Sequence, residues 1–284
     1  MAKRGWREWT AEDARDWIAV PVRSDDKYTR GVLGVCTGSA DYPGAAVLGV
    51  EAAMRTGVGM VRYLGPARAA TFVLQRRPEI VTVPGRVQAW LLGSGMTAAV
   101  RDAETAAALD QALGEGLPTV CDAGALDLAG RATGPTVITP HFRELAGLLG
   151  LSGEPVTAAE IAGAPGEWAI RAATALRVTV LLKGAVTHVA SPSGTLLSVS
   201  SAPAWLATAG SGDVLGGILG ALLATNSARI AADADALAAL AAMAAVIQAR
   251  AAALASAGGP IAALDVAEAV PATLATLRGA HAGA

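Results

Sequence analysis

Short runs of apolar, often β-branched residues alternate with helical patterns along most of this 284-residue chain. Near-continuous apolar strands separated by helices are typical of a mostly parallel sheet that helices cover on both faces. The sequence therefore predicts the α/β class with three layers, helix, sheet and helix. The predicted strands are 31–37, 58–63, 89–92, 119–121, 136–138, 178–182, 186–190 and 195–199, and the predicted helices are 44–56, 100–113, 142–149, 168–175, 214–223, 233–257 and 266–277.

The last two predicted strands are joined by a Ser-Pro-Ser-Gly turn at 191–194. A short turn of this composition joins neighbouring antiparallel strands, so the sequence predicts a late antiparallel hairpin at one end of the sheet. No linker rich in Pro, Ser or charge divides the chain, and no internal repeat is evident. We therefore predict one domain over 1–284, with 1–25 as an N-terminal extension.

Composition excludes several classes of partner. The formal net charge is −2 and no block of basic residues occurs, which argues against nucleic acid as a partner. The N-terminus has no apolar run of the signal-peptide kind, and the longest apolar segment, 236–247, is too short to span a bilayer. Cys36 and Cys121 lie in predicted buried strands, so we expect both to be reduced thiols.

The sequence predicts a cytoplasmic protein that does not bind membranes.

Polar and glycine-rich segments follow the predicted strands. In open α/β sheets, ligands bind beyond the carboxyl ends of the strands, so these segments should line one site. The segments are Thr37-Gly38-Ser39 with Tyr42-Pro43-Gly44-Ala45, Gly93-Ser94-Gly95, Asp122, Thr139-Pro140-His141, Lys183-Gly184-Ala185 and Gly210-Ser211-Gly212-Asp213.

The turn Gly210-Ser211-Gly212-Asp213 runs directly into an apolar helix pattern. Glycines let backbone N–H groups approach an anion closely, and the start of the helix adds its positive dipole end. Asp213 places a carboxylate beside this anion hole, an arrangement suited to phosphoryl transfer to a hydroxyl. The alternative is a glycine-rich turn with Asp213 as a helix cap.

Lys183 follows a buried strand, where a lysine needs an anionic partner; the alternative is a side chain that extends into solvent. Asp122, at another strand end, and Glu144, in the next helix, are candidate Mg²⁺ ligands through water. Magnesium in proteins is usually bound by one or two carboxylates together with phosphates. Solvated or capping carboxylates are the alternative reading of these two residues.

Six segments together resemble the ADP/ATP-dependent NAD(P)H-hydrate dehydratases, repair enzymes of the ribokinase-like superfamily. The similarity covers nearly the whole chain and includes a terminal segment, LDVAEAVPATL, like the family's last helix. The resemblance implies a ribokinase-like fold and a dehydratase domain without the epimerase domain to which it is fused in many bacteria. The segments are GSADYPGA (38–45), LLGSGM (91–96), TVCDAGAL (119–126), VITPHFREL (137–145), VLLKGAVTHVASPSG (180–194) and LATAGSGDVLGGILGALLA (206–224).

The resemblance also implies a reaction. NADH or NADPH hydrated at C6 of the nicotinamide ring carries a hydroxyl that leaves poorly. The family phosphorylates this hydroxyl with ADP in most bacterial members and with ATP in eukaryotic ones. Phosphate then leaves and NAD(P)H is restored, with AMP as the second product where ADP is the donor. We expect an ADP-dependent carbon–oxygen lyase.

Family positions carry over to individual residues. Asp213 would be the general base, and Gly210, Ser211 and Gly212 would hold the transferring phosphoryl group. The hydrated dinucleotide, NAD(P)HX, would contact Ala45, Gly95, His141 and Asp213. The nucleotide would lie along Lys183, Gly184, Ala185, Val186 and Thr187, and against Gly212.

Several segments depart from the family pattern. Many relatives read PHPGE where this chain has PHFRE (140–144), DADAL where it has DAGAL (122–126), and GPG where it has GSG (93–95). These departures bear on the dinucleotide pocket and the metal site more than on the reaction. The resemblance further implies a homo-oligomer, typically a tetramer, and a separate epimerase as a functional partner.

Two other functions stay open at this stage. A ribokinase-like kinase acting on a vitamin-precursor alcohol would use the same base and anion hole and would release a stable phosphoester. A non-catalytic nucleotide-binding protein could retain the fold, although the glycines and Asp213 are both present. Neither the choice between ADP and ATP nor that between NADHX and NADPHX follows from the sequence.

Overall fold

The computed structural model describes residues 5–233 and 235–279, within which the chain builds one nine-stranded sheet in the order β1-β9-β8-β7-β6-β5-β4-β2-β3. The strands are β1 (Arg7–Glu8), β2 (Val32–Cys36), β3 (Met60–Tyr63), β4 (Ala89–Leu92), β5 (Thr119–Cys121), β6 (Thr136–Ile138), β7 (Thr179–Leu182), β8 (Thr187–Ala190) and β9 (Leu196–Val199).

Most neighbouring strands of the sheet are parallel. Strand β8 pairs antiparallel with both β7 and β9, and the remaining pairs are parallel. This confirms the predicted mostly parallel sheet with a late antiparallel hairpin. Strand order reverses direction between β2 and β4, which makes the carboxyl ends of these two strands the switch point where open sheets bind ligands.

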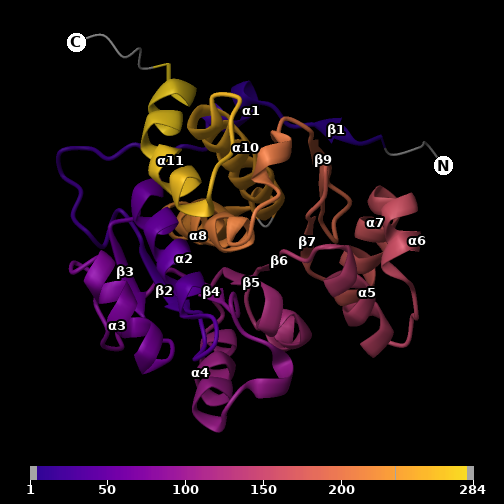
Figure 1. Ribbon diagram of the computed structural model, residues 1–284, viewed down its shortest axis with the longest axis horizontal. Coiled ribbons are helices and arrows are strands. Elements are labelled where there is room, and N and C mark those ends of the chain that lie inside the picture. Colours follow the sequence, from indigo (N-terminus) through magenta and orange to yellow (C-terminus); the bar gives the residue numbers. More distant parts are fainter. Residues whose placement is uncertain (1–4, 234, 280–284) are drawn as a thin grey trace.

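Helices cover the two faces of the sheet in separate layers (Figure 1). Helices α2, α8, α10 and α11 pack on one face, and α4, α5 and α7 on the other. Side chains alternate along the strands, so that Leu33 and Val35 of β2 join one apolar cluster and Cys36 the other. The main helices are α2 (Pro43–Thr56), α3 (Ala67–Arg76), α4 (Ala103–Gly114), α5 (Phe142–Leu151), α7 (Pro165–Leu176), α8 (Ser211–Thr225), α10 (Ala236–Ser256) and α11 (Ala263–Leu277).

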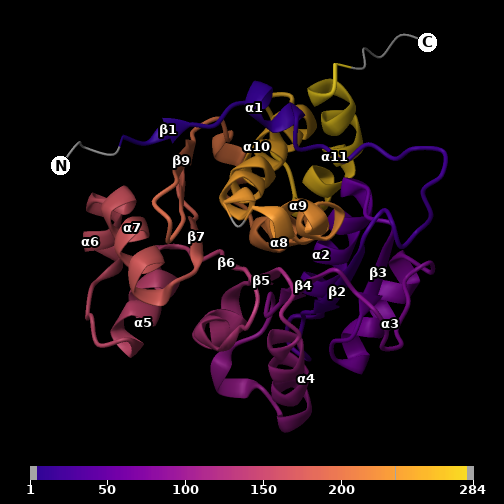
Figure 2. The same ribbon diagram turned by 180° about the vertical axis from the view of Figure 1, so that it is seen from behind.

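Several short elements lie outside the sequence prediction. Strand β1 pairs with β9 at the sheet edge, so part of the N-terminal extension belongs to the sheet (Figure 2). The other unpredicted elements are helices α1 (Ala11–Arg15), α6 (Ala158–Gly163) and α9 (Ser227–Ala232) together with α3, and three 3₁₀ segments, Ala98–Val100, Ala123–Arg131 and Ala204–Leu206. The predicted domain and the predicted helix 233–257 also include residues 1–4, 234 and 280–284, which lie outside the described residues.

Helix α10 is longer than the apolar segment the sequence analysis identified. It has 21 residues and is long and apolar enough to cross a membrane by those two criteria alone. However, 83% of its most apolar window is buried inside the fold. Packing against α8, α11 and the sheet therefore accounts for its composition. Cys36 and Cys121 are both buried and free, as expected.

Helices α2 and α8 approach each other closely, and this contact positions the site. A Cβ placed on Gly217 of α8 would lie 2.1 Å from the carbonyl oxygen of Gly49 in α2 and 3.0 Å from Cβ of Ala52. One on Gly49 would lie 3.4 Å from the carbonyl oxygen of Asp213. Glycine is required here because the backbones themselves are in contact. The first turns of α2 and α8 consequently lie at the same edge of the sheet.

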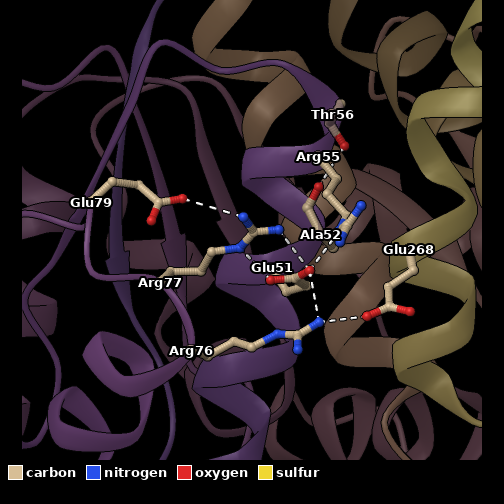
Figure 3. A network of polar contacts seen from close by, with 8 residues as sticks. All are labelled: Glu51, Ala52, Arg55, Thr56, Arg76, Arg77, Glu79 and Glu268. Atoms are coloured by element: carbon tan, nitrogen blue, oxygen red, sulfur yellow. Dashed lines mark hydrogen bonds and ion pairs between the residues drawn. The ribbon is translucent and has the colours of Figure 1, made fainter.

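An ion network holds α2 to its neighbours on the side away from α8 (Figure 3). Glu51 of α2 is fully buried and accepts hydrogen bonds from Arg55 Nε at 2.6 Å, Arg76 Nη2 at 3.2 Å and Arg77 Nη2 at 2.7 Å. Arg76 also contacts Glu268 of α11. Burial alone would raise the pKa of Glu51, but the three guanidinium groups outweigh it and lower that pKa to about 2.

We expect Glu51→Gln to lower the free energy of unfolding by about 2–4 kcal/mol near neutral pH. Because the pKa of Glu51 is depressed on folding, its contribution is present above the ordinary value of 4.5 and is lost as the pH falls toward about 2. Urea unfolding at several pH values should show the difference from wild type shrinking over that window. Glu268→Gln, at the exposed end of the network, should cost less than about 1 kcal/mol; a difference independent of pH would contradict the assignment.

Candidate active site

The turn before α8 has the backbone geometry that an anion site requires. Gly210 has φ +86°, and a Cβ there would lie 2.5 Å from Cδ1 of Leu48, so both conformation and space require glycine. Gln248 of α10 donates from Nε2 to the carbonyl oxygen of Ser211 at 2.5 Å, and this hydrogen bond ties the turn to α10. The first N–H groups of a helix have no intrahelical acceptor and lie at its positive dipole end. The amide of Ser211, which the sequence analysis placed at the anion, donates instead to the carbonyl oxygen of Thr208 at 3.3 Å. The amides of Gly212 and Asp213 are therefore the ones available to an anion.

Asp213 lies in the first turn of α8, beside this anion site. The pKa of Asp213 is raised to about 7. Burial is the largest cause and the negative charge of Asp122 is the second, whereas the positive charge of Lys183 lowers the pKa. A carboxylate with a pKa near neutrality can accept a proton from a hydroxyl and still be deprotonated in a useful fraction of molecules. The electrostatics fit the general-base role that the sequence analysis predicted.

Asp122 links the carboxyl ends of four neighbouring strands. It follows β5 and accepts hydrogen bonds from Ser94 Oγ after β4 at 2.9 Å and from Thr139 Oγ1 after β6 at 2.7 Å. Lys183, after β7, donates from Nζ to Oδ1 of Asp122 at 3.1 Å. Asp122 is 3% exposed. The sheet order β4-β5-β6-β7 therefore places these side chains in one connected polar network at the carboxyl edge.

Lys183 directs its ammonium group toward the anion site. A Cβ placed on Gly212 would lie 3.5 Å from Nζ of Lys183, and Oε2 of Glu144 lies 3.7 Å from the same nitrogen. Burial alone would lower the pKa of Lys183, but the carboxylates of Asp122 and Glu144 outweigh it and raise that pKa. The lysine is a charged, paired group at the site, which excludes the alternative of a side chain extended into solvent.

His141 and Glu144 form a reciprocal cap at the start of α5. Nδ1 of His141 accepts from the amide of Glu144 at 3.1 Å, and Oε2 of Glu144 accepts from the amide of His141 at 2.7 Å. The imidazole side chain is 52% exposed, and the amide of Lys183 donates to the carbonyl oxygen of Pro140 at 2.9 Å. His141 therefore stands next to Lys183 with its ring open to a ligand.

Ala45 and Gly95 lie against each other, as two residues of one binding surface should. Gly95 has φ +67°, and a Cβ there would lie 2.3 Å from Cβ of Ala45 and 3.0 Å from the carbonyl oxygen of Tyr42. The Cβ position on Gly95 also lies 3.3 Å from Cα of Gly38. These residues flank the β2–β4 switch point. Ala45 lies in the first turn of α2, and Gly49, one turn further along α2, contacts Asp213 in the first turn of α8.

The segment 183–187 connects β7 to β8 at the same edge of the sheet. Gly184, Ala185 and Val186 are exposed, and Thr187 begins β8. A Cβ on Gly184 would lie 2.9 Å from Cζ of Phe142. The aromatic residue of the PHFRE departure therefore packs against the predicted nucleotide segment. The effect of this departure on the dinucleotide pocket stays a prediction.

The described residues contain no group of three or more His, Cys, Asp or Glu side chains placed to hold a metal ion. Asp122 accepts three hydrogen bonds, and an ammonium group lies between it and Glu144. This donor set fits a magnesium ion bound mainly by nucleotide phosphates, with at most one or two carboxylates near it. It does not fit an ion held by protein ligands alone.

Three residues around the site had no assigned role in the sequence analysis: Ser94 and Thr139 of the polar network, and Gln248 behind the turn before α8. Ser94 and Thr139 lie in segments that follow strands, and that position is a usable signal. Gln248 is one of few polar residues in the Ala-rich helix α10 and is 7% exposed. A buried amide in an apolar helix needs a hydrogen-bond partner, although its identity depends on the fold.

Comparison with known proteins identifies the family of the chain. The model of the NAD(P)H-hydrate dehydratase family matches residues 33–271. The chain is 45% identical over 222 residues to the bifunctional NAD(P)H-hydrate repair enzyme of Mycobacterium tuberculosis, covering 72% of this chain and 43% of that protein. It therefore spans less than half the length of that relative.

A second relative is closer to this chain in length. The ADP-dependent (S)-NAD(P)H-hydrate dehydratase of Neisseria meningitidis is 37% identical over 223 residues, which cover 72% of this chain and 73% of that one. The solved structure of the ADP/ATP-dependent NAD(P)H-hydrate dehydratase of Bacillus subtilis, co-crystallised with ATP and Mg²⁺, superposes with a TM-score of 0.82 at 24% identity, covering 96% and 99% of the two chains. The chain belongs to the NAD(P)H-hydrate dehydratase family.

Proposed function

We propose that the chain converts the 6S hydrates of NADH and NADPH back to the intact coenzymes, with ADP as the phosphoryl donor and ATP as the less favoured one. The observation that carries the proposal is the position of Asp213, whose pKa is about 7, in the first turn of α8, next to Gly212, which the ammonium group of Lys183 approaches. The relative from N. meningitidis is named an ADP-dependent dehydratase, which supports ADP.

In the first step, Asp213 accepts the proton of the C6 hydroxyl as its oxygen attacks the terminal phosphorus of the nucleotide. The new oxygen–phosphorus bond replaces the bond to the nucleotide, and AMP leaves when ADP is the donor. The amides of Gly212 and Asp213 and the ammonium group of Lys183 stabilise charge on the transferring group. Gly210 and Ser211 hold the turn that presents those amides.

In the second step, the phosphorylated oxygen leaves C6 as inorganic phosphate and takes the bonding electrons with it. The lone pair of the ring nitrogen drives this departure, and loss of a proton from C5 restores the dihydropyridine. Ala45, Gly95 and His141 hold the dinucleotide so that C6 faces Asp213. The nucleotide lies along Lys183, Gly184, Ala185, Val186 and Thr187.

We also propose that Mg²⁺ enters with the nucleotide, near Glu144 and Asp122 and through water. When bound, the ion would neutralise phosphate charge. Asp122 itself holds Lys183 in place, and Glu144 orients His141 through the shared helix cap. The chain is further proposed to act as a single domain in a homo-oligomer in the cytoplasm and to work with a separate epimerase.

The near-ultraviolet absorbance of the reduced nicotinamide ring tests the proposal. Purified protein is added to hydrated NADH with Mg²⁺ and with ADP, with ATP or with no nucleotide. An absorbance rise that depends on nucleotide, fastest with ADP, is expected. Accumulation of a stable phosphorylated alcohol, with no rise, would instead identify a small-molecule kinase. Nucleotide binding without either product would identify a non-catalytic protein.

The pKa of Asp213 predicts the pH dependence of this reaction. Because the base must be unprotonated, kcat/KM should fall about tenfold for each pH unit below pH 7, the region of its pKa. The charged groups that set this value are Asp122, which raises it, and Lys183, which lowers it. Rates measured at saturating nucleotide over a broad pH range check the prediction. Full activity down to pH values near the ordinary aspartate pKa would contradict it.

A further inference from the structure

A cavity of about 590 Å³ lies beside the switch point and contains none of the residues assigned above. The carboxyl ends of β2 and β3, the first turn of α3 and much of the length of α4 line it. Residues around it include Leu64, Pro66, Trp90, Asp102, Glu104 and Ala108. Asp213, Lys183 and His141 are not among its lining residues, so it is a neighbour of the reaction centre and not the centre itself.

A short series of close backbone approaches connects this cavity to Gly95, on the proposed dinucleotide side of the site. Gly38 lies 3.3 Å from the position a Cβ on Gly95 would occupy, and a Cβ on Gly38 would lie 3.2 Å from Cβ of Ala69 in α3. The neighbours of Ala69 in the same helix, Ala67 and Ala70, line the cavity. A dinucleotide that contacts Gly95 with its reactive half therefore has the cavity next to it along the sheet edge.

The lining suits a nucleoside and does not suit a phosphate. Cavities of a few hundred Å³ with apolar walls and a few polar groups are typical small-molecule sites. Thr82, Thr105 and Gln111 supply neutral polar groups, whereas Asp102 and Glu104 supply two carboxylates. No Lys, Arg or His is among the residues that line it. In dinucleotide sites, an acidic side chain binds the ribose 2′-hydroxyl, and an arginine accommodates a 2′-phosphate.

One carboxylate is held in place by the helix it begins. Asp102 is the N-cap of α4, and its Oδ1 accepts from the amide of Thr105 at 2.7 Å. Glu104 lies in the first turn of the same helix. Repulsion between these carboxylates and a doubly charged phosphate would be felt only by NADPHX, because NADHX has a hydroxyl at that position.

We propose that this cavity binds the adenosine half of the hydrated dinucleotide and that Asp102 and Glu104 make the chain prefer NADHX over NADPHX. This inference rests on the function proposed above and names its substrate preference. It assigns the cavity a task in the same reaction, in which Ala45, Gly95 and His141 hold the nicotinamide half.

The ratio of kcat/KM for NADHX to that for NADPHX tests the inference. Wild type should favour NADHX by about tenfold or more. Glu104→Lys should lower that ratio by about tenfold or more, mainly through a lower KM for NADPHX. Glu167→Lys is the matched control, since Glu167 is an exposed glutamate in the first turn of α7 and lies outside the cavity. The control should leave the ratio at the wild-type value.

A second variant tests the location. Ala108→Phe should fill the cavity and raise KM for both dinucleotides at least about fivefold, with a melting temperature that shows the protein is folded. Equal kcat/KM values for the two hydrates in wild type, an unchanged ratio in Glu104→Lys, or an unchanged KM in folded Ala108→Phe would each overturn the inference. Failure of wild type to turn over either hydrate would contradict the proposed function itself, and this inference with it.

Discussion

The Asp213→Asn variant is expected to lose about 10²–10⁴-fold in kcat while it still binds nucleotide. The substitution removes the group that accepts the hydroxyl proton and preserves the size of the side chain. The amides of the α8 turn and the ammonium group of Lys183 remain, so ADP should bind within a few-fold of wild type. Steady-state turnover of the hydrate and calorimetric titration with ADP measure the two properties separately.

A matched control exists elsewhere in the chain. Asp265 occupies the third position of α11, as Asp213 does in α8, and caps its helix through the amide of Ala262 at 2.8 Å. Asp265→Asn should leave kcat close to wild type, because the Asp265 carboxylate accepts from the amide of Ala262 and asparagine can retain that hydrogen bond. Near-normal turnover in Asp213→Asn would show that another group is the base, and loss of ADP binding would show that Asp213 is needed to form the site.

The Gly217→Ala variant should be destabilised by about 3 kcal/mol or more. The added methyl would lie 2.1 Å from the carbonyl oxygen of Gly49, and neither backbone can move without separating α2 from α8. Since these helices carry Ala45 and Asp213 in their first turns, turnover should fall as well. Urea unfolding of the purified variant measures the loss of stability.

The same substitution at an unobstructed helical glycine gives the opposite expectation. A Cβ on Gly147 in α5 has no neighbour within 4 Å. Gly147→Ala should be neutral or stabilising by about 0.5–1 kcal/mol, the usual gain from replacing glycine in a helix. A melting temperature for Gly217→Ala equal to that of wild type would contradict the close crossing of α2 and α8.

The central strands could be predicted because they are short, apolar on both faces and separated by helical patterns. Strand β5, for example, has the predicted bounds Thr119–Cys121. Strand β1 could not be predicted, because Arg7 and Glu8 are both exposed and their strand conformation depends on pairing with β9. Apolar periodicity carries no information on such an edge contact. Helix α3 did carry a local signal, because its buried residues Ala69 and Val73 are four positions apart, and the sequence analysis missed it.

In the site, too, some residues have a local sequence signal and others depend on how the strands are arranged. Asp213 and Lys183 follow recognisable local patterns, a glycine turn before a helix and a charged residue after a buried strand. The shared contact of Ser94, Thr139 and Lys183 with Asp122 depends on which strands are neighbours in the sheet. Side-chain periodicity does not determine strand order, so this network required the fold. The raised pKa of Asp213 required it as well, because burial is the main cause and the charge of Asp122 the second.

The fate of the hydrate oxygen tests the account most directly. Hydrated NADH prepared with ¹⁸O at its C6 hydroxyl is incubated with the protein, ADP and Mg²⁺, and the inorganic phosphate is analysed by mass spectrometry. Phosphoryl transfer to that hydroxyl followed by elimination predicts one ¹⁸O atom in each phosphate, formed in equal amounts with NADH and AMP. Unlabelled phosphate, with the label recovered in water, would contradict phosphorylation of the hydroxyl and the role given to Asp213.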